Sequence, residues 1–262
     1  MTPAVGDVVD ARYELLRDLG GDRTGRVFVA RDRPLGREVA LRVVDAGDSA
    51  AVEALRREAR RMSGVQFDSA QAVAVLDEGE SGDGVAYVAS ELVTGLTLEK
   101  LARRRGPLPE AEAAKYAVEL LDACRAVHRG ARERLAIVPG SAIVTHDGHV
   151  RVTRFVEVAP DPAGADPACA AVARVLRRLL EGAEEPPVLE AAIDRALDGS
   201  IATVEGLRAR ISDAARGPVT PLVPVPPEDP TRRVWPLVLI SFAILALLVL
   251  LVVGIPLIIS DG

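Results

Sequence analysis

The chain has 262 residues and a formal net charge of −6, and 49% of its residues are hydrophobic. This length allows one large domain or two small ones, and the hydrophobic fraction is sufficient for a substantial core. The acidic balance argues against a nucleic-acid partner, which normally requires a basic face. Cys124 and Cys169 form no CxxC or Cys/His cluster. The sequence therefore predicts no metal site.

The first hundred residues have the pattern of strands with a single helix. Alternating or β-branched runs predict the strands, and turn signals such as Gly20-Gly21 separate them. An amphipathic run, stopped by Gly64, predicts the helix. The predicted strands cover 12–20, 26–32, 38–45, 72–80 and 84–93, and the helix covers 49–65.

After Gly95 the pattern becomes helical, apart from one hairpin. Asp147-Gly148 is a tight-turn signal and predicts a strand hairpin over 142–158. The predicted helices cover 96–106, 109–131, 166–182, 187–198 and 203–215. A β-rich small lobe followed by a helical large lobe is an α+β, two-lobed plan.

The C-terminal part differs in composition from the rest. Residues 217–233 are rich in proline, which predicts an extended juxtamembrane linker. Residues 234–259 are apolar and carry no charge, and about 20 such residues span a bilayer, so they predict one transmembrane helix. Arg232 and Arg233 precede this helix. The positive-inside rule then places the N-terminal domain in the cytoplasm and the tail, 260–262, outside the cytoplasmic membrane.

Four segments in series resemble one protein family. They are "RYELLRDLG…GRVFVARD", "GREVALRVV", "YVASELVTGLTLEKLARRRGPL" and "THDGHVRVTRF". With this order and spacing, residues 12–216 resemble the kinase domain of bacterial membrane-anchored Ser/Thr protein kinases. The resemblance implies a two-lobed protein-kinase-like fold. It also implies a shortened activation segment, because few residues separate Val156 from the helix that begins near Asp166.

The resemblance can be carried over to the phosphate-binding positions. The glycine-rich loop becomes "GGDRTG", in which Gly20 and Gly25 match the outer glycines and Asp22 replaces the middle one. A carboxylate there obstructs the approach of phosphate and repels it. The strand lysine becomes Arg42, and its partner glutamate is Glu58, so an Arg42–Glu58 ion pair is expected.

The catalytic positions depart further from the family pattern. Ala136 stands at the catalytic aspartate and Ser141 at the metal-binding asparagine. Arg154 stands at the aspartate of the DFG motif, and a guanidinium cannot ligate magnesium, which requires oxygen ligands. We expect Arg154 either to pair with Glu58, Asp22 or Glu157 or to hold nucleotide phosphate without metal.

These substitutions predict a protein that is not an enzyme. The expected function is that of a catalytically inactive pseudokinase, a membrane-tethered binding, scaffolding or regulatory module without a cofactor. The alternative is an atypical nucleotide-binding Ser/Thr kinase with metal-independent or residual activity. This alternative predicts a nucleotide cleft formed by Gly20, Asp22, Gly25, Ala40, Arg42, Glu58, Ser90 and Glu91.

The linker also carries two candidate phosphorylation sites, Thr220 and Thr231. A phosphate adds about −1.5 to −2 charges and three strong acceptors, which arginine-rich domains can read. The resemblance implies an active Ser/Thr kinase or a phosphothreonine-reading domain as partner, and a homo- or heterodimer. The alternative is that both threonines are plain linker residues.

Overall fold

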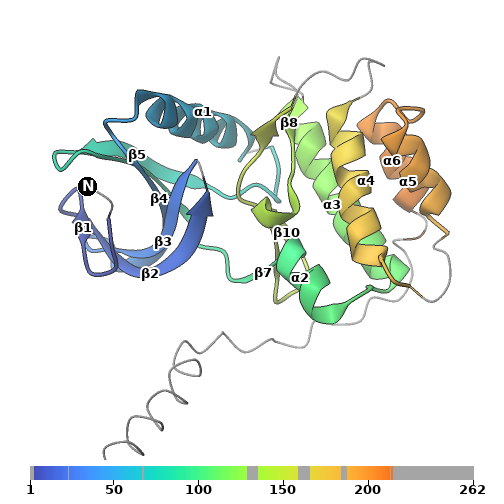
Figure 1. Cartoon of the computed structure of the whole chain (residues 1–262), viewed down its shortest axis with the longest axis horizontal. Helices are drawn as coiled ribbons and strands as arrows, with labels where there is room; N and C mark the ends of the chain where they lie inside the picture. Colours follow the sequence, from blue (N-terminus) through green and yellow to red (C-terminus); the bar gives the residue numbers. More distant parts are fainter. Residues whose placement is uncertain are drawn as a thin grey trace, which may run out of the picture. The chain divides into compact units, whose positions relative to one another are not determined.

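The computed structural model describes residues 3–22, 24–66, 68–128, 135–158, 166–183, 188–212 and 214. They lie in one compact unit, Met1–Leu222, which contains two lobes (Figure 1). The small lobe is a sheet with one helix, and the large lobe consists of helices and short strands. The predicted α+β, two-lobed plan is confirmed.

The small lobe is a six-stranded antiparallel sheet in the order β1-β2-β3-β4-β6-β5. Alternate residues of β4 face opposite sides: Val39 and Leu41 pack in one core, whereas Val44 packs against α1. Arg42 therefore lies on the same face of β4 as Val44. The elements are β1 (Val8–Val9), β2 (Tyr13–Asp22), β3 (Gly25–Asp32), β4 (Arg37–Asp45), α1 (Ser49–Val65), β5 (Val75–Ser81) and β6 (Val85–Glu91).

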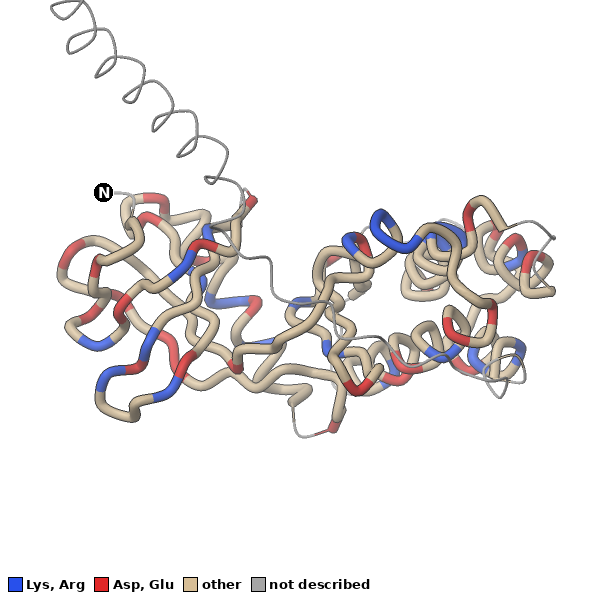
Figure 2. Tube along the Cα trace, turned by 90° about the horizontal axis from the view of Figure 1, so that it is seen from below, with Lys and Arg blue, Asp and Glu red and all other residues tan. Residues whose placement is uncertain are grey.

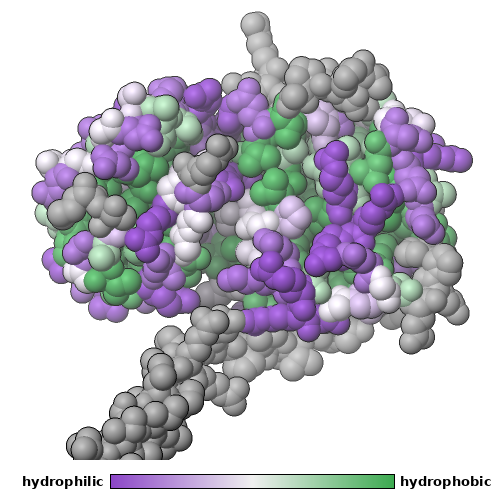
Figure 3. Space-filling view, viewed as in Figure 1, coloured by the Kyte–Doolittle hydropathy of each residue, from purple (hydrophilic) through white to green (hydrophobic). Residues whose placement is uncertain are grey.

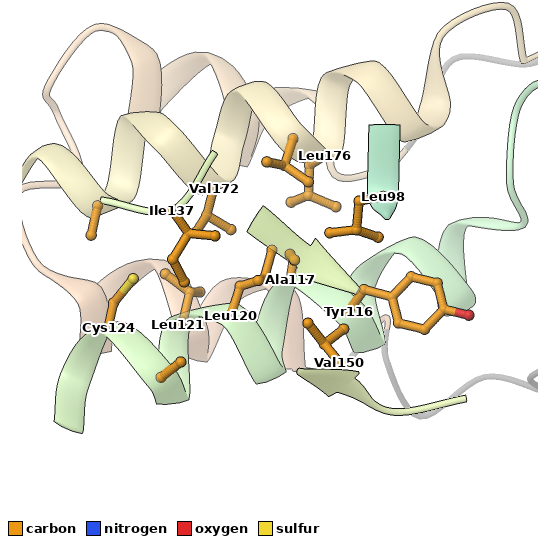
Figure 4. Packing of buried hydrophobic residues seen from close by; sticks show 14 of the residues in the cluster. Leu98, Tyr116, Ala117, Leu120, Leu121, Cys124, Ile137, Val150, Val172 and Leu176 are labelled. Carbon is orange, nitrogen blue, oxygen red and sulfur yellow. The ribbon is translucent and has the colours of Figure 1, made fainter. Parts of the chain in front are cut away.

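The large lobe is built around α3, which packs against α4 and α6. Figure 4 shows Leu120 and Leu121 of α3 among Ile137 and Val172, and all four are fully buried. The elements are β7 (Gly95–Thr97), α2 (Leu98–Arg105), α3 (Glu110–His128), β8 (Leu135–Ala136), a 3-10 turn (Pro139–Ser141), β9 (Ala142–Thr145), β10 (Val150–Val152), β11 (Val156–Glu157), α4 (Pro167–Leu180), α5 (Glu190–Leu197) and α6 (Val204–Ser212).

The predicted hairpin over 142–158 is only partly correct. Its turn lies at Asp147-Gly148 as expected, and β9 pairs with β10. The pairing ends at Val152, because the N–H of Ser141 donates to the Val138 carbonyl within the 3-10 turn, although the N–H of Thr153 still donates to the Ser141 carbonyl. β11 then pairs with β8, which the sequence did not predict as a strand.

Backbone hydrogen bonds join the two lobes near the end of β10. The N–H of Val73 donates to the Val152 carbonyl at 3.0 Å, and the N–H of Val152 donates to the Gln71 carbonyl at 2.7 Å. These bonds hold the end of β10 against the chain that enters β5. They fix the backbone two residues before Arg154.

The predicted linker, transmembrane segment and tail (217–262) lie outside the described residues, as do Thr220 and Thr231 within them. In the part of the chain that the structure describes, no helix has the length and apolar character needed to cross a bilayer.

Charged residues of both signs are interspersed along both lobes (Figure 2). The most enclosed carboxylate of the small lobe is Asp32, which is fully buried. Arg12 donates to it from Nε at 2.9 Å and from Nη2 at 2.8 Å, and Arg37 lies 3.7 Å away. Two guanidiniums thus compensate one buried carboxylate at the end of β3.

We expect Asp32→Asn to lower the free energy of unfolding at neutral pH and to have less effect in acid. The hydrogen bond from Arg12 holds the pKa of the Asp32 carboxyl below its usual range, although burial opposes this. A lowered folded-state pKa stabilises the fold above the unfolded-state pKa of about 3.9. This contribution is lost as the pH falls through the folded-state pKa. Urea unfolding near pH 7 and near pH 3 measures both differences.

The matched control is Asp83→Asn, which removes an exposed carboxylate from the turn between β5 and β6. It should change the free energy of unfolding little at either pH. An equal loss of stability at both pH values for Asp32→Asn would show that the carboxylate charge is not what Asp32 contributes.

Candidate functional site

A cavity of about 260 Å³ lies between the two lobes. On the face shown in Figure 3, hydrophobic residues reach the surface where the small lobe on the left meets the large lobe. Five residues that the sequence assigned to a nucleotide cleft line this cavity, namely Ala40, Arg42, Glu58, Ser90 and Glu91. The other three, Gly20, Asp22 and Gly25, do not line it.

The sequence missed most of the apolar lining. Leu19 and Val27 flank the β2–β3 turn, Leu92 and Val93 follow β6, and Ile143 comes from β9. These residues belong to ordinary hydrophobic strand patterns, so no local signal separates them from the core. Apolar walls with a few convergent polar groups are typical of a small-molecule site.

Helix α1 and strand β6 both contribute to the cavity. Leu55, Ala59 and Met62 of α1 line it, as does Ser90 of β6. The Ser90 hydroxyl lies 3.4 Å from the Ala40 carbonyl, a long contact, and Arg151 donates to the Glu91 carboxylate at 2.5 Å. Ser90 lines the same cavity as these residues of α1.

The predicted Arg42–Glu58 ion pair is present. Nε of Arg42 lies 3.8 Å from Oε1 of Glu58, and each side chain is 17% exposed. Burial raises the pKa of Glu58, and Arg42 beside it opposes this rise. Burial lowers the pKa of Arg42, and the positive charge of Arg154 lowers it further. A second cation thus lies close enough to Arg42 to repel it.

Arg154 follows β10 and reaches the β2–β3 turn of the other lobe. Its Nη2 lies 3.0 Å from Oδ2 of Asp22, and its Nη1 donates to Oγ1 of Thr24 at 2.6 Å. Nη1 of Arg42 donates to the same Thr24 oxygen at 2.8 Å. The two guanidiniums therefore converge on one hydroxyl.

Of the three partners expected for Arg154, the structure shows an ion pair with Asp22. Glu157 pairs instead with Arg61 at 2.9 Å. Glu58 pairs with Arg42, although the charge of Arg154 also opposes the rise in the Glu58 pKa that burial causes. The sequence left these partners open.

In this network Asp22 accepts several hydrogen bonds, whereas one donor of Arg154 has no acceptor among the described residues. Burial raises the pKa of Asp22, but bonds from the Thr24 hydroxyl and N–H and from Arg154 outweigh it and lower the pKa to about 2. Asp22 therefore stays ionised near neutral pH. Within the described residues, Nε of Arg154 is buried and has no hydrogen-bond acceptor. One donor of this guanidinium is unsatisfied.

Gly25 sets how closely the turn approaches β4. Its φ is +119°, and a Cβ there would lie 2.6 Å from the Val43 carbonyl oxygen. Only glycine accepts both constraints without a shift of the backbone. The close approach helps to place Thr24 within hydrogen-bond reach of Arg42.

The other two substituted positions carry no charge. Ala136 is 2% exposed and pairs with Val156 in the short sheet of β8 and β11. Ser141 is also 2% exposed, and its hydroxyl donates to the Val138 carbonyl at 2.9 Å. Across the described ranges, no group of three or more His, Cys, Asp or Glu residues could hold a metal ion.

The chain is similar to curated bacterial kinases. It is 31% identical over 154 residues to the serine/threonine-protein kinase PrkC of Bacillus subtilis, covering 58% of this chain and 23% of that protein. It is 31% identical over 166 residues to PknA of Mycobacterium tuberculosis H37Rv, covering 59% and 37%. The chain thus spans well under half the length of these relatives. No family model matches it.

Solved structures support the fold. The kinase domain of Mycobacterium tuberculosis PknI has a TM-score of 0.60 and 21% identity, and the match covers 82% of this chain and all of that domain. A second structure of the same domain has a TM-score of 0.61, also at 21% identity, with 82% and 99% covered. At this identity the similarity shows the fold alone.

These findings correct one prediction. From Arg42, Ala136, Ser141 and Arg154 we expected that the chain is not an enzyme. The relatives are named as Ser/Thr protein kinases and the structural neighbours are kinase domains, which contradicts this expectation. The inference was wrong because it rested on four substituted positions alone, and the loss of a metal ligand does not by itself exclude activity.

The substitutions themselves remain facts of the sequence, and the resemblance that located them is confirmed. The chain is a homologue of bacterial Ser/Thr protein kinases, and it has the fold of a protein-kinase domain.

Proposed function

We propose that this domain is an atypical Ser/Thr kinase that binds a nucleoside triphosphate without a metal ion and transfers phosphate slowly. The observation that carries the proposal is the convergence of Arg42 and Arg154 on Thr24, beside the interlobe cavity. The homologues are named Ser/Thr protein kinases, which supports the reaction class.

The two arginines can supply positive charge where a kinase of the usual kind uses lysine and magnesium. Phosphoryl transfer depends mainly on positioning and on neutralising charge at the phosphate oxygens. Guanidinium groups bind phosphate through two parallel hydrogen bonds, which are charge-assisted and therefore strong. Nε of Arg154 is a buried donor without an acceptor among the described residues, and a movement of this side chain would make it available for such a bond.

The cavity can receive the base and sugar. Its walls are mostly apolar, and the small Ser90 side chain is one of the few polar groups among them. Arg42 and Glu58 line the same cavity, so a ligand seated there lies next to the first guanidinium. The bound nucleotide would extend from the apolar part toward Arg42.

Slow transfer follows from the residue at the catalytic position. Ala136 cannot accept the proton of the attacking hydroxyl, and a general base contributes about 10²- to 10⁴-fold to such reactions. The transition state of phosphoryl transfer is loose, with little bond formation to the nucleophile, so charge stabilisation can act without that base. ADP leaves as the new bond forms, and the hydroxyl proton passes to a phosphate oxygen or to water. We therefore expect activity to be reduced.

The proposal predicts nucleotide binding that does not depend on metal. The full chain should bind ATP in excess EDTA with a Kd within about twofold of that in magnesium, because the described residues hold no set of metal ligands for the cation to complete. Calorimetric titration measures both values. Binding seen only with magnesium would contradict the proposal.

A second readout separates binding from catalysis. ATP labelled at the γ-phosphate and incubated with the full chain in EDTA should yield slow label transfer to protein hydroxyl groups. The matched control is Arg174→Ala on the surface of α4, which removes one exposed arginine outside the cleft. It should leave both ATP binding and transfer unchanged.

The proposed kinase is held at the cytoplasmic membrane by residues 234–259, with the domain on the cytoplasmic side. Thr220 and Thr231 in the linker are then within reach of this kinase or a related one. Phosphorylation there would give an arginine-rich, phosphothreonine-reading domain a binding site. Mass spectrometry of the chain after incubation with ATP would identify both sites.

A further inference from the structure

We propose that the Asp22 carboxylate is an internal competitor for nucleotide phosphate and sets the affinity of this cleft for phosphorylated ligands. It occupies donors of Arg154 and Thr24 that a phosphate would need. This inference rests on the proposed function, because it concerns the same cleft.

The competition follows from the contacts of Asp22. Its Oδ2 lies 3.0 Å from Nη2 of Arg154, and its Oδ1 accepts from the Thr24 N–H at 2.7 Å and from the Thr24 hydroxyl. Charged nitrogen, backbone N–H and hydroxyl groups are the donors that bind phosphate oxygens in proteins. A carboxylate held by all three occupies an anion site.

The contact between Asp22 and Arg154 lies outside the lining of the cavity. Arg42 and Glu58 line the cavity, whereas Asp22, Thr24 and Arg154 do not. These three residues form a bridge from the β2–β3 turn of the small lobe to the end of β10 in the large lobe. A nucleoside fits beside the bridge, whereas a triphosphate must displace Asp22 from Arg154.

The bridge can open without disrupting the core. The Asp22 side chain is 50% exposed and Arg154 is 14% exposed, so water can reach the carboxylate but much less of the guanidinium. Displacement would return Asp22 to solvent at little desolvation cost. An incoming phosphate would replace it on the less exposed partner.

The test compares Asp22→Asn with the wild-type full chain, using ATP and adenosine as probes in EDTA. Asparagine keeps the shape of the side chain and can still accept from the Thr24 N–H, but it loses the charge. We expect Asp22→Asn to bind ATP about three- to tenfold more tightly than the wild type. The variant loses a partly exposed ion pair with Arg154 and also loses the repulsion between the carboxylate and the phosphate. Adenosine affinity should not change, because adenosine carries no phosphate.

Two further variants control this result. Asp18→Asn removes the same charge from the same hairpin, where Asp18 pairs with Arg26 rather than with Arg154, and should leave both affinities unchanged. Asp22→Gly removes the side chain entirely and should tighten ATP binding in the same direction as Asp22→Asn. Thermal unfolding verifies that each variant is folded.

Each outcome decides between the claims. If the wild type binds ATP and Asp22→Asn binds it equally or more weakly, Asp22 does not compete with phosphate. The proposed function is then left intact. An equal gain for ATP and adenosine overturns the role of Asp22 as a competitor too, because the effect would not concern phosphate. If no variant binds ATP, the proposed function fails and the inference fails with it.

Discussion

Arg154→Ala should weaken the binding of ATP to the full chain in EDTA by about 10- to 100-fold. Hydrogen bonds to charged groups contribute about 1.5–3 kcal/mol each, and 1.4 kcal/mol corresponds to a tenfold change in affinity. The variant also leaves Asp22 without its ion-pair partner beside the incoming phosphate, which adds repulsion. Calorimetric titration of both proteins measures the difference.

The binding of adenosine separates a local effect from a folding defect. Arg154 does not line the cavity, so Arg154→Ala should keep the wild-type affinity for adenosine. Arg154→Lys should recover only part of the loss, because lysine supplies a point charge without the two parallel donors of a guanidinium. If the wild type and Arg154→Ala bind ATP with equal affinity, Arg154 is not part of the phosphate site.

Arg105→Ala should have the largest effect on stability among the charged residues of the large lobe. Glu112 is fully buried, and it accepts from Arg105 at 2.7 and 3.3 Å and from the Tyr116 hydroxyl at 2.8 Å. Removing one partner of a buried ion pair costs about 3–5 kcal/mol. Arg105 is 31% exposed, so we expect about 3 kcal/mol, the lower end of that range. Urea unfolding measures it.

Two further variants test whether the unpaired, buried Glu112 carboxylate causes the stability loss of Arg105→Ala. Arg103→Ala breaks an exposed pair with Glu99 on the same helix and should cost about 0.5 kcal/mol or less. Adding Glu112→Gln to Arg105→Ala should restore part of the lost stability, because a neutral amide is less costly to bury than an unpaired carboxylate. If the double variant recovers no stability, the loss comes from the missing packing contacts of the Arg105 side chain and not from the unpaired Glu112 charge.

Much of the fold is predictable because its longer elements have regular periodicity. The strands β2, β3, β4 and β6 and helix α1 lie where alternation and amphipathicity place them. The two-residue strands β1, β8 and β11 are too short to show a period, and tertiary pairing alone creates them. Because β11 is equally short, the sequence could not show that it pairs with β8 rather than continuing the hairpin after Val152.

The site was less predictable because its contacts are long-range. Resemblance located Arg42, Glu58 and Arg154, and the expected Arg42–Glu58 pair is present. The partner of Arg154 comes from a turn 132 residues earlier, and three carboxylates were equally acceptable by charge. Thr24 was missed as the shared acceptor, because a threonine in a polar turn carries no signal of its own.

The most direct test of the arginine-based phosphate site is ³¹P NMR of ATP in EDTA with the full chain. The wild type should shift or broaden the β- and γ-phosphate resonances, and Arg154→Ala should largely abolish this change. The result that would contradict the account is ATP binding, shown by competition with adenosine, that leaves the β- and γ-phosphate resonances unchanged. The nucleotide would then be held by the apolar cavity alone, and the guanidiniums would not replace the metal.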